Sequence, residues 1–232
     1  LVLFFIWSPM RFFRNDIQPE FFEIVVDRGQ KSTLTLPDGS KVWVNSATTV
    51  SYSSDYNVND RDVYLSGEAY FEVASGNELP FVVHARDLQV TALGTRFNIK
   101  AYSEDNTVTT TLVEGKVSTE AGESSQVLYP YHEALYDKKS GCIKVSEVAD
   151  QLHAIPWMKD EILFDNDSLE EIAVMLERMY NVNVVFSCED VKAYSYTGLV
   201  RNNSLQNVLE LISSTSPVGY RMTSDTIKFY VK

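Results

Sequence analysis

The sequence contains few of the residues that metal, redox or nucleic-acid chemistry requires. Its three histidines (His84, His132 and His153) and two cysteines do not stand at the spacing of a metal-ligand motif or a Cys-x-x-Cys pair. Lys and Arg number 20 against 32 Asp and Glu, which gives a net charge of -12, and no basic cluster offers a surface to phosphates. We therefore expect no metal, no cofactor and no nucleic-acid partner.

The two cysteines leave two arrangements open. Cys142 and Cys188 are either buried free thiols or, in an oxidising compartment, partners in a disulfide. Their separation in sequence does not choose between these alternatives, because a disulfide depends on the distance between the two residues in space.

The apolar run at the start of the chain is too short to cross a bilayer. LVLFFIW covers residues 1–7, whereas a spanning helix needs about 20 residues, and Pro9 ends any helix here. The run is a buried strand, an exposed tail or the end of a spanning helix. The basic and aromatic segment RFFR at residues 11–14 is typical of a membrane interface and favours the helix end. We assign residues 1–22 to a membrane-proximal segment.

Motifs of enzymes that act on diffusible substrates are also missing. The chain has no Gly-x-Ser-x-Gly elbow and no phosphate-binding glycine loop. Glu68 and Glu72 in GEAYFEV are four residues apart and would face the same side of a strand. Paired carboxylates can perform acid–base chemistry, but Ala69 and Phe71 between them indicate an ordinary half-buried strand. We therefore expect no enzyme of this kind.

Strand patterns fill the chain from residue 23 to residue 150. In LTLPDGSKVWVN, apolar and polar residues alternate on both sides of Asp38-Gly39, which predicts a hairpin. Further strand-like runs cover residues 61–65, 69–73, 81–85, 89–93, 96–102, 107–113, 116–119 and 126–129. Many short strands at close spacing predict an all-β domain, either β-solenoid-like or a sandwich.

A helical period begins after Pro156-Trp157. Ser168 and Glu171 form a capping box at the start of SLEEIAVMLERMY, and Asn181 ends this helix. A second helix begins at Ser204, 36 residues after Ser168, and strand-like runs flank both helices. The sequence therefore predicts a small domain at residues 157–232, with two β-α-β units whose helices cover one face of one sheet. The fold class is α+β with two domains.

Five motifs in this order resemble the FecR family of anti-sigma regulators. They are LPDGSKVWVNS, RDVYLSGEAYFEV, PFVVHA, VTALGTRFNIKAY and TLVEGKV, and together they cover residues 36–117. The part from residue 157 onward looks like the small C-terminal domain of many members, which is similar to the secretin and TonB short N-terminal fold. A pair of β-α-β units is what that fold requires.

The resemblance implies a single-pass inner-membrane protein, of which this region lies in the periplasm. It implies two protein partners. The periplasmic region would receive a signal from the N-terminal domain of a TonB-dependent outer-membrane transporter. A cytoplasmic segment, not among these residues, would bind an extracytoplasmic-function (ECF) sigma factor. The inducing signal, a siderophore or a glycan, stays open.

Gly94-Thr95 interrupts the β pattern of VTALGTRFNIKAY. The simpler explanation is a tight bend at Gly94, with the Thr95 hydroxyl hydrogen-bonded locally. The resemblance adds an alternative, because some FecR-like regulators are reported to cleave themselves at a Gly-Thr bond. In that chemistry the threonine hydroxyl attacks the preceding carbonyl carbon and forms an ester that water opens. Both explanations stay open here.

Partner binding is expected at strand edges of the C-terminal domain, where a second protein can add a strand. The candidate residues are Tyr194, Tyr196 and Leu199 on one strand and Phe229 and Tyr230 on another. Alternation would bury half of them. A carbohydrate-binding module is the alternative function, because Trp43 or Trp157 could stack on a sugar ring, although packing is the simpler use of both.

Overall fold

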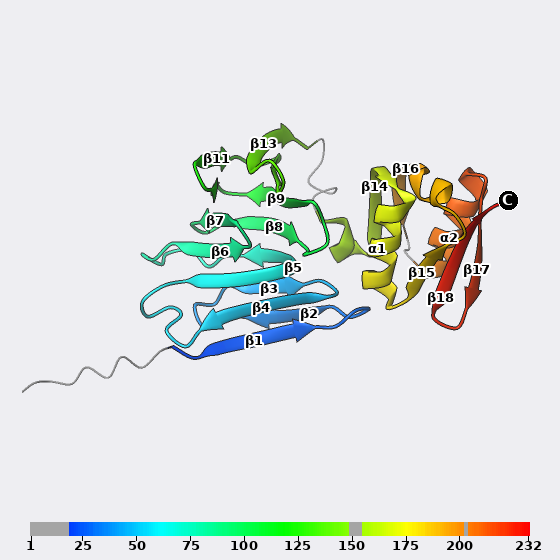
Figure 1. The fold of residues 1–232 in the computed structure, drawn as a ribbon. Coiled ribbons are helices and arrows are strands. Elements are labelled where there is room, and N and C mark those ends of the chain that lie inside the picture. Colours follow the sequence, from blue (N-terminus) through cyan, green and yellow to red (C-terminus); the bar gives the residue numbers. More distant parts are fainter. Residues whose placement is uncertain (1–18, 149–154, 202–203) are drawn as a thin grey trace, which may run out of the picture.

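Strands dominate the structure (Figure 1). The computed structural model describes residues 19–148, 155–201 and 204–232. Up to residue 148 the described chain contains strands and turns but no helix, as the sequence predicts. The helices lie in the last third of the chain, beside the large sheet (Figure 1). The fold is β-rich, with a nearly closed sheet and a few helices.

Thirteen strands form the large sheet, in the order β11-β10-β7-β6-β5-β8-β9-β12-β13, with β1 on β4, β2 on β3, and both β3 and β4 on β5. Their bounds are β1 Phe21–Val26, β2 Ser32–Thr35, β3 Lys41–Val44, β4 Thr48–Ser53, β5 Asp62–Glu72, β6 Phe81–Ala85, β7 Leu88–Ala92, β8 Arg96–Ala101, β9 Thr107–Glu114, β10 Val117–Ala121, β11 Ser124–Leu128, β12 His132–Asp137 and β13 Cys142–Glu147. The predicted Asp38-Gly39 hairpin is confirmed, since β2 pairs with β3 and Leu34 lies opposite Val42.

The long strand β5 joins the two arms of this sheet. Its first half pairs with β4 and β6, and its second half pairs with β3 and β8. A sandwich of two separate sheets is therefore wrong, because β5 continues from one arm into the other. The predicted runs at residues 61–65 and 69–73 are one strand for the same reason. Apolar residues of both arms, among them Val63, Phe71 and Leu112, form one buried cluster.

The C-terminal part contains five strands, two α-helices and two short 3-10 helices: η2 Pro156–Lys159, β14 Glu161–Ser168, α1 Leu169–Tyr180, β15 Asn183–Phe186, η3 Glu189–Ala193, β16 Ser195–Arg201, α2 Leu205–Thr215, β17 Val218–Thr223 and β18 Thr226–Val231. The capping box of Ser168 and Glu171 is confirmed, and Asn181 ends α1 in the left-handed conformation. Ser204 caps α2.

The two β-α-β units do not share one small sheet, which corrects the expectation from the sequence. The leading strands β14 and β16 pair with each other, while β15, β18 and β17 form a separate sheet. The leading strands of the two copies therefore pair, whereas β18 separates the trailing strands β15 and β17. Helix α1 contacts strands of both sheets, and α2 contacts β17. Side chains from both helices and both sheets form a second buried cluster, which includes Phe164, Leu176 and Phe229.

No helix within the described residues is long and apolar enough to cross a membrane. The LVLFFIW run, expected to be the end of a spanning helix, lies outside the described residues.

Candidate functional site

The Gly94-Thr95 bond lies where the chain crosses from one arm of the sheet to the other. Leu93 and Gly94 follow β7, and Thr95 leads directly into β8. Gly94 has φ +68°, and a Cβ at this position would lie 2.9 Å from the Cβ of Ser75. Both the conformation and the close neighbour favour glycine here. The predicted bend is confirmed, and it connects two arms rather than closing a hairpin.

The Thr95 side chain is buried without a hydrogen bond. It is 2% exposed, and its Oγ1 has no partner within the part of the chain that the structure describes. Its methyl group lies against Gly115, where an added Cβ would come within 2.6 Å of Thr95 Cγ2. The expected local hydrogen bond of the hydroxyl is therefore wrong, because packing against Gly115 rather than a polar partner holds this side chain.

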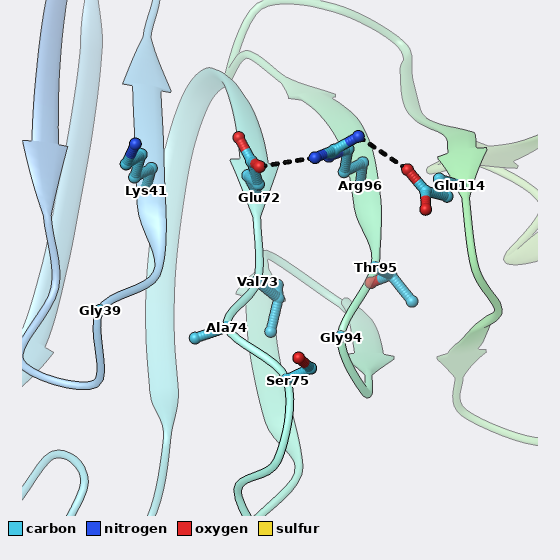
Figure 2. Close-up of a pocket in the computed structure, with 10 residues that line it drawn as sticks. All are labelled: Gly39, Lys41, Glu72, Val73, Ala74, Ser75, Gly94, Thr95, Arg96 and Glu114. Atoms are coloured by element: carbon cyan, nitrogen blue, oxygen red, sulfur yellow. Dashed lines mark hydrogen bonds and ion pairs between the residues drawn. The ribbon is translucent and has the colours of Figure 1, made fainter.

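A cavity of about 340 Å³ opens beside this bond, and Gly94, Thr95 and Ser75 line it (Figure 2). The Arg96 guanidinium bridges Glu72 and Glu114, with both N–O distances at 2.8 Å (Figure 2). The main-chain amide of Val73 donates to the carbonyl of Thr95 at 2.9 Å. These contacts hold Thr95 and Arg96, on the C-terminal side of the Gly94-Thr95 bond, in place.

A reaction at the Gly94-Thr95 bond would be intramolecular. The hydroxyl of Thr95 is tethered next to the Gly94 carbonyl, so attack needs no external nucleophile. Leaving a buried hydroxyl unpaired costs about 1–3 kcal/mol, and such an orphaned group is rare in folded proteins. The Gly94-Thr95 bond is therefore the candidate site.

The two carboxylates of GEAYFEV do not work as a pair. Glu68 accepts hydrogen bonds from the side-chain amides of Asn45 and Asn98, at 2.8 and 3.0 Å. Glu72 is bound to Arg96 instead. The opposite face of the strand carries buried Ala69 and Phe71, as the alternation predicts. Each carboxylate therefore has its own structural partners.

The five candidate partner-binding residues separate into packed and exposed groups. Tyr196 and Phe229 are buried, and the Tyr196 hydroxyl lies 2.8 Å from Ser216 Oγ. Tyr194 is partly buried and packs against the C-terminal cluster. Leu199 is partly exposed, and Tyr230 is 37% exposed. The expected edge position of Phe229 and Tyr230 is wrong, because their strand β18 lies between β15 and β17. Of the five, Tyr230 presents the most surface, and the side chains of Tyr196 and Phe229 serve the core.

The tryptophans proposed for sugar stacking have packing roles. Trp43 packs against Tyr70, with ring centroids 5.6 Å apart. Trp157 is 7% exposed and donates from Nε1 to the Asn98 side-chain oxygen at 3.2 Å. Trp43 is partly exposed, and both rings line a cavity of about 280 Å³.

The histidines and cysteines form no metal site within residues 19–148, 155–201 and 204–232. His84 pairs with Asp62, His132 lies near main-chain carbonyls, and His153 falls outside the described residues. Cys142 and Cys188 are both free and exposed, so the expectation of buried thiols or a disulfide is wrong. Both lie on polar strand or loop segments rather than in either core.

Sequence reasoning missed two buried arginines. Arg61 is 1% exposed and binds Asp38 of the predicted hairpin turn and the carbonyls of Leu79 and Ala74. Arg178 on α1 is 6% exposed and binds Glu104 and Asp105 in the loop between β8 and β9. Only the predicted turn at Asp38 offered a signal, because a turn carboxylate needs donors nearby. Nothing in the pattern of α1 marks Arg178 as buried.

Comparison with known proteins matches most of the described chain. The family model for FecR protein matches residues 22–118, and the model for FecR, C-terminal matches residues 161–229. Two crystal structures of candidate anti-sigma factors from Parabacteroides distasonis ATCC 8503 are similar to this chain. One is 30% identical with a TM-score of 0.85 and covers 92% of this chain and 100% of its own. The other is 31% identical with a TM-score of 0.84 and covers 91% and 99%. No curated protein gives a significant match.

Proposed function

Because this chain belongs to the FecR family, we propose that it is the sensor region of an anti-sigma regulator. One observation carries this proposal: both family models match in the expected order, and a candidate anti-sigma factor of known structure is similar along 92% of the chain. The region is proposed to act through protein contacts and to have no activity on a diffusible substrate.

The finer proposal concerns the route of the signal. The region receives it in the periplasm from the N-terminal domain of a TonB-dependent outer-membrane transporter and controls an ECF sigma factor through a cytoplasmic segment. A single membrane span connects the two compartments. The strands β15, β16 and β17 support this proposal. Each is paired on one side, and within the described residues its other edge pairs with no strand. Such edges can accept a strand from a partner.

The two buried clusters suggest two units, which we propose have different roles. Residues 23–150 are the proposed all-β unit and residues 157–232 the proposed small α+β unit. Within the described residues, the two clusters share no residue, which supports this division. Each unit therefore has a core of its own, as a domain requires. The smaller unit carries the free strand edges and is the proposed receiver.

Crosslinking and affinity purification of the full-length protein from its own cells test this proposal. We expect mass spectrometry to recover a TonB-dependent transporter and a sigma factor, the transporter through the region described here. A Val185→Asp variant, on the exposed edge strand β15, is expected to lose the transporter and keep the sigma factor. Val127→Asp, equally exposed on the edge strand β11 of the large sheet, serves as a matched control. Recovery of neither partner under inducing and non-inducing conditions contradicts the proposal.

A second candidate function is self-cleavage at Gly94-Thr95, favoured by the buried Thr95 hydroxyl without a partner. The Thr95 oxygen attacks the Gly94 carbonyl carbon, the peptide C–N bond breaks, and the hydroxyl proton moves to the nitrogen. Water then hydrolyses the ester, which leaves a carboxyl group on Gly94 and a free hydroxyl and amine on Thr95. Intact mass measurement of protein from its own cells tests this. Two fragments that end at Gly94 and begin at Thr95 support it, and one intact chain in cells that signal normally contradicts it.

A further inference from the structure

The contact between the two units is held by a few polar groups and is poorly packed. Trp157 reaches Asn98, and Lys31 donates to the Trp157 carbonyl at 2.7 Å and pairs with Asp160 at 2.8 Å. Two cavities, of about 350 and 500 Å³, lie between the units and are lined from both sides. Domains commonly move relative to one another at polar interfaces that are not tightly packed.

Arg178 makes the most extensive of these contacts. From α1 it pairs with Glu104 at 3.0 Å and with Asp105 at 2.9 Å, both in the loop between β8 and β9. Its guanidinium carbon lies 3.8 Å from the ring centroid of Tyr102. Its main-chain carbonyl also accepts from the amide of Gly29, at 2.9 Å. One side chain therefore combines two ion pairs with a cation–π contact, which arginine can make and lysine cannot reproduce.

The remaining charges at this interface are mainly acidic. Glu133 on the large sheet faces Asp165 and Asp167 on β14, and all three line the same cavity. Burial raises the pKa of both Glu133 and Asp167, as expected for carboxylates that lose water and have few cationic neighbours. Lys100 is the other cation beside them and lines both cavities. If Arg178 were removed, Lys100 would remain to oppose the repulsion between Glu133, Asp165 and Asp167.

We propose that Arg178 is a latch that holds the α+β unit against the large sheet, and that its release lets this unit move as a body. The closed position is the one seen here. The open position uncovers the outer face of β8 and β9, where Asn98, Lys100 and Thr111 lie. A partner that supplies a carboxylate to Arg178, or a cation to Glu104 and Asp105, would shift the balance toward the open position. The proposal rests on the two-unit division proposed above but not on the identity of any signal.

The two natural cysteines allow the latch to be tested without introducing new labelling sites. Cys142 on β13 and Cys188 before η3 are exposed free thiols, one on each unit. Spin labels on both report the distance between the units by double electron–electron resonance. We expect a single narrow distance distribution in the wild-type chain. Arg178→Gln is expected to broaden it and to reduce the closed population severalfold.

The control and the second variant keep the test decisive. Arg201→Gln removes an exposed arginine of the same unit, whose side chain is 81% exposed and lies 3.7 Å from Glu161, and should leave the distribution unchanged. The double variant Glu104→Gln/Asp105→Asn removes the partners of Arg178 on the large-sheet side and should open the interface as Arg178→Gln does. It provides the test if Arg178→Gln folds poorly. A distribution that stays narrow in the folded latch variants overturns the proposal, as does a broad one in the wild type. The distance measurement uses the purified chain and needs no partner. Its outcome is therefore independent of whether a transporter or sigma factor is recovered from cells.

Discussion

At the scale of single residues, Thr95 has an unusual environment. Its hydroxyl is buried without a hydrogen bond while its methyl group packs against Gly115. Thr95→Val keeps the shape and removes the unpaired hydroxyl, so we predict that the free energy of unfolding rises by about 1 kcal/mol. Urea unfolding measures this change. A loss of stability of similar size would mean that the hydroxyl has a partner, such as water.

Substitutions at Thr95 also distinguish a simple bend from a peptide bond that is cleaved. We predict that Thr95→Val abolishes fragments that begin at residue 95, while Thr95→Ser, which keeps a hydroxyl, still yields them. Intact mass spectrometry of protein from its own cells measures the fragments. Cleavage that persists in Thr95→Val would point to an external protease.

A second residue-scale prediction concerns the buried pair of Arg61 and Asp38. Both side chains are at most 1% exposed, and Arg61 Nε donates to Asp38 at 2.9 Å. Removing one partner leaves a buried charge, so we predict that Arg61→Met lowers the free energy of unfolding by about 3–5 kcal/mol. The matched control is Arg96→Met, which removes two solvent-exposed ion pairs and should lower stability far less than Arg61→Met.

The same pair contributes an acid dependence to stability. Burial alone would raise the pKa of the Asp38 carboxyl, but hydrogen bonds from Ser40 and Arg61 lower it below 3.8. A carboxyl with a lowered pKa in the folded state stabilises the protein above its unfolded pKa. This stabilisation is lost as the pH falls through the lower, folded value. We predict that stability decreases between about pH 5 and pH 2 and that Asp38→Asn weakens this dependence in urea unfolding.

At the scale of elements, the two helices of the α+β unit differ at their first turns. Ser168 and Glu171 form a reciprocal capping box on α1, and the Glu171 carboxylate accepts from both the amide and the hydroxyl of Ser168. On α2 the Ser204 hydroxyl accepts from the amide of Asn207, and the first turn carries no acidic side chain. We predict that Ser168→Ala lowers the free energy of unfolding by about 1 kcal/mol and that Ser204→Ala costs less. Thermal unfolding of the two variants side by side measures the difference. Equal losses would mean that the Glu171 contact contributes nothing.

At the scale of the whole molecule, the two buried clusters should be separable in stability. Leu176 on α1 and Leu112 on β9 are each at most 1% exposed, one in each cluster. Truncation of a buried leucine to alanine costs about 2–5 kcal/mol. We predict that Leu176→Ala lowers amide protection in residues 156–232 and leaves β5 protected, and that Leu112→Ala does the reverse. Hydrogen exchange read by mass spectrometry measures both, and a uniform loss would indicate one cooperative unit.

The local patterns of the sequence predicted much of this fold. The Asp38-Gly39 hairpin, the capping box at Ser168, the stop at Asn181 and the repeat at Ser204 all depend on neighbouring residues, so the sequence contains the information. The five motifs were enough to identify the family, because they keep their order along the chain. The bend at Gly94 was predictable for the same reason.

Only the tertiary structure decided how these pieces pair. The continuity of β5 through both arms and the separate sheets of β14–β16 and β15–β18–β17 depend on strands far apart in sequence. The missing partner of the Thr95 hydroxyl and the burial of Arg178 are likewise set by residues more than a dozen positions away. Local propensity fixes where a strand or helix begins. The energy of pairing and burial comes from long-range neighbours, and those appear only when the chain is folded.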